Sequence, residues 1–340
     1  MAAKAQFWDV VYRILNGDTA AGLDHDTTYI QSYRDDLALS AVTSYQGSSI
    51  SVKRKDGNRL TYSTNTNLQY GIGLDYKWLG IEASFSIPVL STLDPERGTT
   101  KINGFGFGYT GRSWWFRNYF RNSKGYSPND PTRVDPDWSD GDPYPYRDDI
   151  RNFTYMASLD HGFNAERFSY NAAIWQMERQ KRSAGSWIAG ATFWYSETSW
   201  DTPLIPSFDA AEYAAPTGDV NAARTWVFSL TGGYSYTVVI GKHGFINALA
   251  VPGLGFRQVR MDLKQGGDTG TGWEVAGTAE FRLGMGYIGD RWYAAITGNS
   301  FRSIGPIPPD VFLAQDLFNM RGAIGWRFKN VGPFIPKIGL

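Results

Sequence analysis

The stretch from Asn67 to Pro88, NLQYGIGLDYKWLGIEASFSIP, decides the fold class. In its first half every second residue is large and apolar: Leu68, Tyr70, Ile72, Leu74, Tyr76 and Trp78. The residues between them are small or polar: Gln69, Gly71, Gly73, Asp75 and Lys77. This period of two predicts a β-strand with one apolar and one polar face. In a soluble sandwich the apolar face would be buried in a core, whereas in a membrane barrel it would face lipid.

The composition narrows the class of protein. The chain has 340 residues, a formal net charge of +0 and 16% aromatic residues, and it has no cysteine. A neutral chain lacks the basic surface that nucleic-acid binding requires, so we expect no nucleic-acid partner. Without cysteine there is no disulfide framework, thiol nucleophile or thiolate metal site. No run of 18 apolar residues occurs, which excludes a transmembrane helix.

The alternating pattern recurs along the chain. It is clear in Trp226–Tyr236, Trp273–Tyr287 and Met320–Lys329. Weaker segments centre on 37–46, 80–88, 101–111, 114–121, 152–162, 167–179, 186–196, 244–257 and 291–302. Together with the opening stretch these predict 13 strands, but single-chain bacterial barrels have an even number. Either 203–213 contains another strand, which gives 14, or two segments merge, which gives 12.

Segment lengths and links favour a membrane barrel over a soluble sandwich or propeller. Segments of 9 to 14 residues match a tilted strand that crosses a bilayer. Short links, as at 111–113 and 288–290, alternate with long ones, as at 122–151 and 197–223. Outer-membrane barrels have short periplasmic turns, long outer loops and aromatic residues at both interfaces. Aromatic residues indeed stand at the predicted strand ends: Trp78, Tyr109, Trp226, Tyr287 and Trp326.

The predicted fold is therefore an all-β, antiparallel transmembrane β-barrel of 12 to 14 strands with a short N-terminal amphipathic helix. The helix is expected at Phe7–Leu15, where apolar residues recur at helical spacing. Residues 1–35 form a periplasmic helix and connector, 36–329 the barrel and 330–340 a tail. Ala3-Lys4-Ala5 has the small-x-small form that precedes a signal-peptidase cut. We expect a bacterial outer-membrane location with both termini periplasmic, and outer-membrane lipid and lipopolysaccharide as partners.

The chain also resembles a known family. The likeness rests on DTTYIQSY (Asp26–Tyr33), on GLDYKWLG at the end of the opening strand, on QKRSAGS (Gln180–Ser186) and on GGYSY (Gly232–Tyr236). These features resemble domain-of-unknown-function family 4421 (DUF4421), predicted outer-membrane β-barrels of Gram-negative bacteria, over roughly Asp26 to Phe328. The resemblance implies a barrel and an envelope location, and it implies no activity. Many such barrels end on an aromatic residue, whereas here a tail follows Phe328.

Charged residues in the middle of predicted strands are the first candidate site. In a barrel they would line the lumen and could pair with one another. These lumen-lining candidates are Asp75, Lys77, Glu280, Arg282, Arg321 and Arg327. The QKRSAGS turn has two interpretations: a tight connection through Ala184 and Gly185, or a turn that serves recognition or gates the lumen.

Other motifs have simpler explanations. Six aspartates lie in the loop DPDWSDGDPYPYRDD. One interpretation is a calcium site at Asp135, Asp137, Asp140 and Asp142, although the spacing is not that of the helix-flanked calcium loop. The alternative is a solvated surface loop. NGFGFGYT opens no helix, so its glycines are not a nucleotide loop. Nothing ties His25, His161 or His243 to a nucleophile, so we predict no catalytic residues.

Three functions remain open. The first is a structural or ligand- or partner-binding component of the envelope, with a possible envelope protein as partner. The second is a narrow channel for a small polar solute. The third is an outer-membrane enzyme that acts on lipid or protein, and the sequence leans against it.

Overall fold

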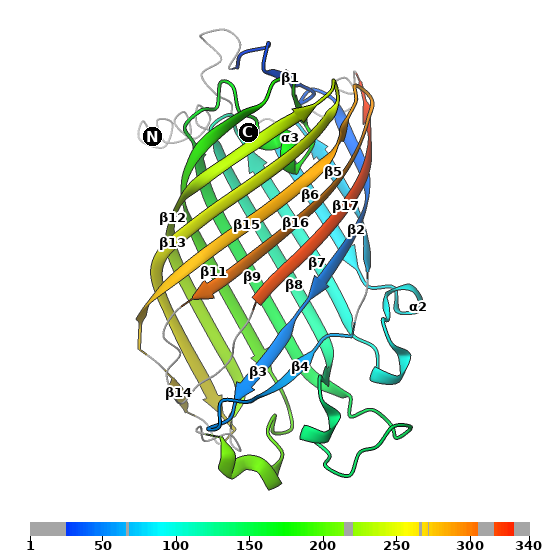
Figure 1. The fold of residues 1–340 in the computed structure, drawn as a ribbon, viewed down its shortest axis with the longest axis vertical. Helices are drawn as coiled ribbons and strands as arrows, with labels where there is room; N and C mark the ends of the chain where they lie inside the picture. The colour runs from blue at the N-terminus through cyan, green and yellow to red at the C-terminus, as the bar shows by residue number, and fades with distance from the viewer. Residues whose placement is uncertain are drawn as a thin grey trace, which may run out of the picture.

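The computed structural model describes residues 25–65, 68–213, 220–264, 267–270, 272–304 and 316–329. The predicted helix at Phe7–Leu15 and the tail 330–340 lie outside the described residues. The described chain is almost entirely β-structure (Figure 1). No described helix is long and apolar enough to cross a membrane.

Twelve antiparallel strands form a closed barrel. In chain order they are β2 (Leu37–Gly47), β5 (Gln69–Tyr76), β6 (Leu79–Phe85), β7 (Lys101–Thr110), β8 (Trp114–Pro128), β9 (Arg147–Gly162), β11 (Ala184–Ser199), β12 (Val220–Ile240), β13 (Gly244–Leu263), β15 (Glu274–Ile288), β16 (Trp292–Ile304) and β17 (Asp316–Phe328). Each pairs with its neighbours in the chain. The pairing of β17 with β2 joins the two ends of the sheet and closes the barrel.

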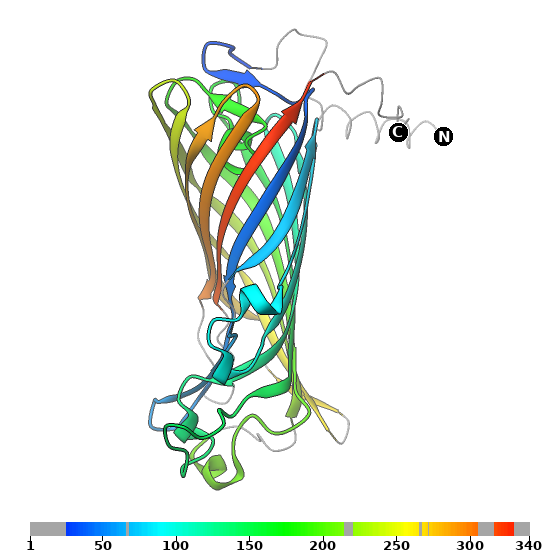
Figure 2. The same ribbon diagram turned by 90° about the vertical axis from the view of Figure 1, so that its right-hand side faces the viewer.

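The remaining elements lie at the two ends of the barrel. At the end with long loops are β3 (Ser49–Lys53), β4 (Arg59–Ser63), β14 (Asp268–Gly270), α2 (Pro88–Ser91), η2 (Pro95–Arg97), η3 (Pro131–Arg133) and η4 (Ser207–Glu212). At the end with short turns are α3 (Tyr170–Ile174) and a separate two-stranded sheet of β1 (Ile30–Ser32) and β10 (Glu178–Gln180). Figures 1 and 2 show the barrel as a tall cylinder between these two ends.

The strand count falls within the predicted 12 to 14, and the structure identifies the segment that was miscounted. Residues 167–179 form no barrel strand but contain α3 and the start of β10. Their apolar residues imitate strand alternation, yet Ser169 caps a helix by accepting a hydrogen bond from the Ala172 N–H at 2.9 Å. The segment 203–213 contains η4 and likewise adds no barrel strand.

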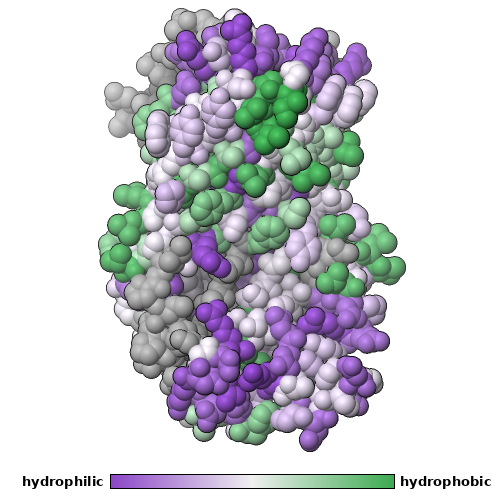
Figure 3. Space-filling view, viewed as in Figure 1, coloured by the Kyte–Doolittle hydropathy of each residue, from purple (hydrophilic) through white to green (hydrophobic). Residues whose placement is uncertain are grey.

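The structure shows which face of the opening stretch points outward. Ile72 of β5 is 72% exposed on the outer face, whereas Gln69 and Asp75 are buried in the lumen. The same division holds around the barrel, where Leu230, Leu283 and other large apolar side chains point outward. Figure 3 shows hydrophobic side chains gathered around the middle of the molecule and hydrophilic ones at both ends. This apolar outer band is the face that a bilayer covers.

Aromatic pairs mark both edges of the band. Near the short turns, Trp78 lies 5.0 Å from Tyr109 and Tyr287 lies 4.5 Å from Trp292, measured between ring centroids. Toward the long loops, contacts run from strand to strand through Phe120–Tyr155, Tyr155–Phe193 and Phe193–Phe228. At the usual rise and tilt of a barrel strand, the stretch from Trp226 to Tyr236 covers roughly 25 Å, the height of a barrel's apolar band.

Candidate functional site

The connection from β9 to β11 closes one end of the lumen. Residues 163–183, called here the mouth segment, start and finish at the short-turn end, and α3 lies inside the barrel wall in both ribbon views (Figures 1 and 2). Ser169, Gln176 and Glu178 of this segment are almost fully buried. A polar segment buried to this degree requires partners for its charges and hydrogen-bonding groups.

Glu178 is the main anchor of the mouth segment. Its carboxylate accepts hydrogen bonds from Nη1 of Arg112 at 3.0 and 3.2 Å, and Nε of Arg34 lies 3.0 Å away. Arg112 comes from the turn between β7 and β8, and it also donates to the carbonyls of Ala165 and Phe168. One buried carboxylate therefore links the mouth segment to a barrel turn and to the chain that enters β2.

A second set of contacts joins β10 to the opposite rim. Nη1 of Arg179 lies 3.0 Å from the Asp290 carboxylate and 2.9 Å from Nδ1 of His243. Tyr33 donates its hydroxyl proton to Asp290 at 2.8 Å. The hydrogen bond from Tyr33, with Arg179 beside it, holds the pKa of Asp290 below its usual value. The rim is thus tied by charge-assisted bonds on two sides of the mouth.

Arg327, near the end of β17, completes the closure. It donates to the carbonyl of Gly289 at 2.6 Å and to the carbonyl of Gln176. Its guanidinium lies 4.1 Å from the ring centroid of Tyr33 and 5.0 Å from that of Tyr293. Stacking between two aromatic rings suits arginine, whose guanidinium is weakly hydrated and planar.

Aromatic side chains of the mouth segment fit against the barrel wall. Tyr170 stacks on Trp115 of β8 with ring centroids 4.1 Å apart. Trp175 lies over two glycines, because a Cβ placed on Gly80 or Gly108 would lie 3.3 Å or 3.0 Å from its ring. Glycine at these positions leaves room for the indole.

Beyond the mouth segment, ion pairs cross the lumen. Arg117 of β8 binds both oxygens of Glu280 on β15, and it also pairs with Asp160 of β9 at 3.1 Å. Arg282 pairs with the same Glu280 at 2.7 Å and donates to the Tyr170 hydroxyl. Arg282 therefore joins these ion pairs of the wall to Tyr170 of the mouth segment in one network.

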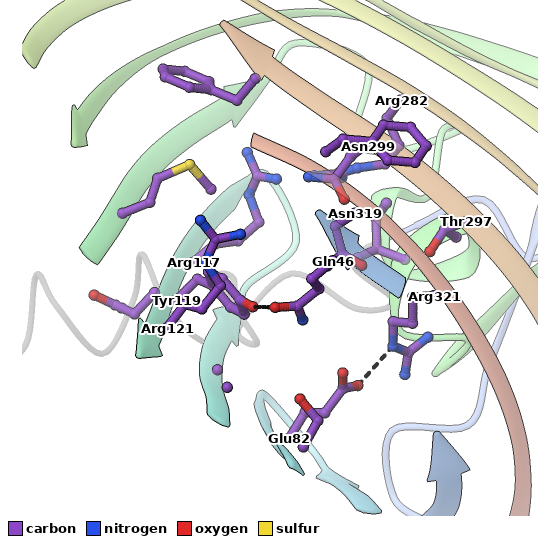
Figure 4. Close-up of a pocket in the computed structure, with 18 of the residues that line it drawn as sticks. Gln46, Glu82, Arg117, Tyr119, Arg121, Arg282, Thr297, Asn299, Asn319 and Arg321 are labelled. Atoms are coloured by element: carbon purple, nitrogen blue, oxygen red, sulfur yellow. Dashed lines mark hydrogen bonds and ion pairs between the residues drawn. The ribbon is translucent and has the colours of Figure 1, made fainter. Parts of the chain in front are cut away.

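A cavity of about 150 Å³ remains between this network and the long-loop end. Arg321 pairs with Glu82 at 2.7 Å on one side of it, and Tyr119 donates to Gln46 at 2.5 Å on the other (Figure 4). Residues on β8 face residues on β16 and β17 across this space. Among the described residues, the lumen thus holds the mouth segment, a set of ion pairs and this cavity.

Five of the six lumen-lining candidates do point inward: Asp75, Glu280, Arg282, Arg321 and Arg327. Lys77 does not. It lies in the turn between β5 and β6, with an exposed side chain over the Tyr76 ring and a φ of 53°. The prediction for Lys77 is wrong because strand β5 ends at Tyr76, so the alternation between inner and outer face does not reach Lys77.

Sequence reasoning missed several lumen residues. Arg117 and Arg121 of β8 point inward, but bulky residues on both faces of WWFRNYFRNS hide the alternation. Glu178 lies in the mouth segment, so no strand pattern could reveal that it is buried. Glu82 was visible in the opening stretch as a charge in the middle of a strand, and that signal could have found it.

The family described as "Domain of unknown function (DUF4421)" matches residues 24–302. The chain belongs to the DUF4421 family. The resemblance seen in the sequence is therefore confirmed. No curated protein sequence matches this DUF4421 member.

Solved barrels resemble this DUF4421 member only remotely. The translocator domain of the autotransporter NalP from Neisseria meningitidis has 13% identity and a TM-score of 0.37, with 96% of this chain and 98% of that chain covered. OmpT, an outer membrane protein of Vibrio cholerae, has 8% identity and a TM-score of 0.28, with coverage of 91% and 100%. The Pseudomonas putida toluene transporter TodX has 9% identity and a TM-score of 0.25, with coverage of 93% and 96%. Similarities this remote say nothing about what the DUF4421 barrel binds or moves.

The histidines and the aspartate-rich loop of this DUF4421 member lie at the two ends of the barrel. His161 lies beside Trp114 on the aromatic edge, and His243 lies at the rim with Arg179. Within the described ranges, no group of three or more histidine, aspartate or glutamate side chains is arranged to hold a metal ion. The calcium site at Asp135, Asp137, Asp140 and Asp142 stays a prediction. Asp135 and Asp142 accept hydrogen bonds from backbone N–H groups of their own turns.

Proposed function

We propose that this protein is an outer-membrane barrel closed by its own chain, which serves as a binding or structural component of the envelope rather than as an open channel. The observation that carries the proposal is the burial of the mouth segment on Glu178 together with the Arg117–Glu280 pair across the lumen. An open pore for polar solutes would need a continuous water-filled path. Here the path meets buried ion pairs instead.

The proposed orientation follows from loop length. The turns between β5 and β6, β7 and β8, β12 and β13, and β15 and β16 are short, and Leu37 pairs with Phe328 at that same end. In outer-membrane barrels such turns face the periplasm. The mouth segment would then close the periplasmic mouth, and both ends of the described chain would lie on the periplasmic side.

The proposed outer-membrane location would bring the protein into contact with lipid and with a partner. The apolar outer band would be covered by outer-membrane lipid, and the long loops would reach the lipopolysaccharide layer. Charge-assisted bonds at the closed mouth make a surface on which a periplasmic protein could compete for Asp290 or Arg179. A partner would be recognised through this competition.

Reconstitution into planar bilayers tests the proposal. The intact protein is expected to give no stepwise conductance above that of the empty bilayer. A variant with the mouth anchors removed, Arg112→Ser combined with Glu178→Ser, is expected to conduct, since it loses both partners of the main ion pair. Steady conductance from the intact protein would overturn the proposal in favour of the narrow channel.

A matched control distinguishes loss of closure from general damage. Arg133→Ser combined with Asp130→Ser removes an exposed pair at the long-loop end, where side chains are 37% and 55% accessible. This control is expected to stay closed. Conductance from the control as well would mean that disturbed packing, rather than the mouth segment, opens the barrel.

A further inference from the structure

Of the described arginines that line the cavity, Arg121 is the one without a carboxylate partner. Arg121 of β8 is only 3% exposed. In the part of the chain that the structure describes, it forms no ion pair with a carboxylate, and its Nε has no hydrogen-bond acceptor. Its one recorded bond runs from Nη1 to the carbonyl of Gly47 at 3.4 Å. A buried charge without a partner is costly, so proteins rarely keep one without a reason.

The other arginines around the cavity do have carboxylate partners. Arg282 pairs with Glu280, Arg117 pairs with both Glu280 and Asp160, and Arg321 pairs with Glu82, so these three arginines are matched by three carboxylates. The excess positive charge at the cavity therefore belongs to Arg121. An arginine with free N–H groups at a cavity wall is the usual means of holding a carboxylate or phosphate.

Other groups around the same cavity are also unpartnered. Nη1 of Arg321 and Nε1 of Trp175 are buried N–H donors with no acceptor among the described residues. Met156, Ile174 and Phe301 supply apolar wall. The cavity thus offers free donors beside apolar side chains. A ligand that fits would have one acidic group and an apolar body.

We propose that the cavity binds a small monocarboxylate with an apolar body, whose carboxylate accepts hydrogen bonds from Arg121 and Arg321. A cavity of about 150 Å³ holds a body about the size of benzene. Met156, Trp175 and Phe301 would contact that body. Free phosphate shares the anionic charge but has no apolar part to bury against these side chains. The inference deepens the proposed binding role and rests on it.

Binding of benzoate to the purified full-length protein in detergent tests the site. Isothermal titration is expected to show saturable binding of benzoate. Benzyl alcohol, which lacks the charge, and inorganic phosphate, which lacks the apolar body, are each expected to bind at least about tenfold more weakly, the factor that 1.4 kcal/mol represents. Equal binding of phosphate would mean that the site recognises any anion and would overturn the proposal. Failure of benzoate and butyrate alike to bind would also overturn it.

Two variants assign the binding to Arg121. Arg121→Gln is expected to weaken benzoate binding at least about tenfold and to remove the rise in unfolding temperature that benzoate gives. Lys124→Gln alters an exposed residue on the same strand and is expected to bind benzoate normally. Unchanged binding by a folded Arg121→Gln variant would overturn the assignment.

The ligand series decides the question if that variant does not fold. Conductance is measured separately, so the two proposals can fail independently. A barrel that conducts yet binds benzoate would overturn the closed lumen and leave the site intact. A closed barrel that binds no monocarboxylate would overturn the binding site and leave the closed lumen intact.

Discussion

Arg117 on β8 and Glu280 on β15 form a two-point ion pair across the lumen, with Nη1–Oε1 at 2.9 Å and Nη2–Oε2 at 3.0 Å. The two strands lie far apart in the sheet order, so the pair bridges the barrel rather than neighbouring strands. Both side chains are nearly inaccessible to solvent. A buried ion pair of this kind adds little net stability. Losing one partner destabilises the protein strongly, because the other charge is then buried without a counterion.

Glu280→Gln should therefore destabilise the barrel strongly. The change leaves Arg282 without a carboxylate and Arg117 with Asp160 alone. Removing one partner of a buried pair costs about 3–5 kcal/mol. Urea unfolding in lipid vesicles, followed by tryptophan fluorescence, would measure the loss. Glu96→Gln, at an exposed position in η2, is the control and should change stability by less than about 0.5 kcal/mol. A loss from Glu280→Gln no larger than that of the control would contradict the bridging role.

The close packing of Trp175 against Gly108 predicts that a larger side chain at position 108 disturbs the mouth segment. A Cβ on Gly108 would lie 3.0 Å from Cζ2 of Trp175, whereas a Cβ on Gly106 meets nothing nearer than the Asn118 carbonyl at 3.4 Å. Gly108→Val should push the indole away and loosen the mouth segment, at a cost of about 1–3 kcal/mol for overpacking. Single-channel recording should then show transient openings. Gly106→Val should stay closed, and similar openings in both variants would rule out the steric explanation.

The sequence predicted the strands of the barrel wall far better than the segment that closes the lumen. Ile72 and Gln69 sit on opposite faces because a strand alternates strictly, and that period is visible without a structure. The mouth segment obeys no such period. Glu178 is buried only because Arg112 and Arg34 reach it from distant parts of the chain, and such contacts leave no local pattern. Lys77 shows the same limit on a smaller scale, since the pattern cannot say where a strand stops.

Acid should loosen the long loop at 200–213. Asp149 lies at the outer end of β9, beyond the aromatic edge. It accepts hydrogen bonds from Arg147 at 2.7 and 2.8 Å and from the backbone N–H groups of Asp201 and Thr202 at 3.0 Å. Burial raises its pKa, but these bonds outweigh burial and hold the pKa well below the usual value. Because the folded pKa is below the unfolded one, the stabilisation is complete above about pH 4 and is lost as the pH falls further.

Hydrogen exchange of the 200–213 backbone would detect this loss. Between pH 6 and pH 3, after correction for intrinsic rates, protection in the loop should fall roughly tenfold, as expected for charge-assisted bonds worth about 1.5–3 kcal/mol. Asp149→Asn should have low protection at both pH values. Asp148→Asn, the exposed neighbour, should behave like the unaltered protein. Equal pH dependence with and without the Asp149 carboxylate would refute its role.

Ile72, at the centre of the opening stretch, gives the most direct test that its face meets lipid. It is 72% exposed on the outer face of β5. Ile72→Arg should cost about 2–4 kcal/mol if the side chain lies near the middle of a bilayer, since a charge there loses its hydration. Phe208→Arg alters an apolar residue of η4, 59% exposed in the long-loop region, and should cost little because water already surrounds it. Urea unfolding in vesicles measures both changes. Were the outer face in water, the two substitutions would be equally harmless, and the transmembrane assignment of β5 would fail.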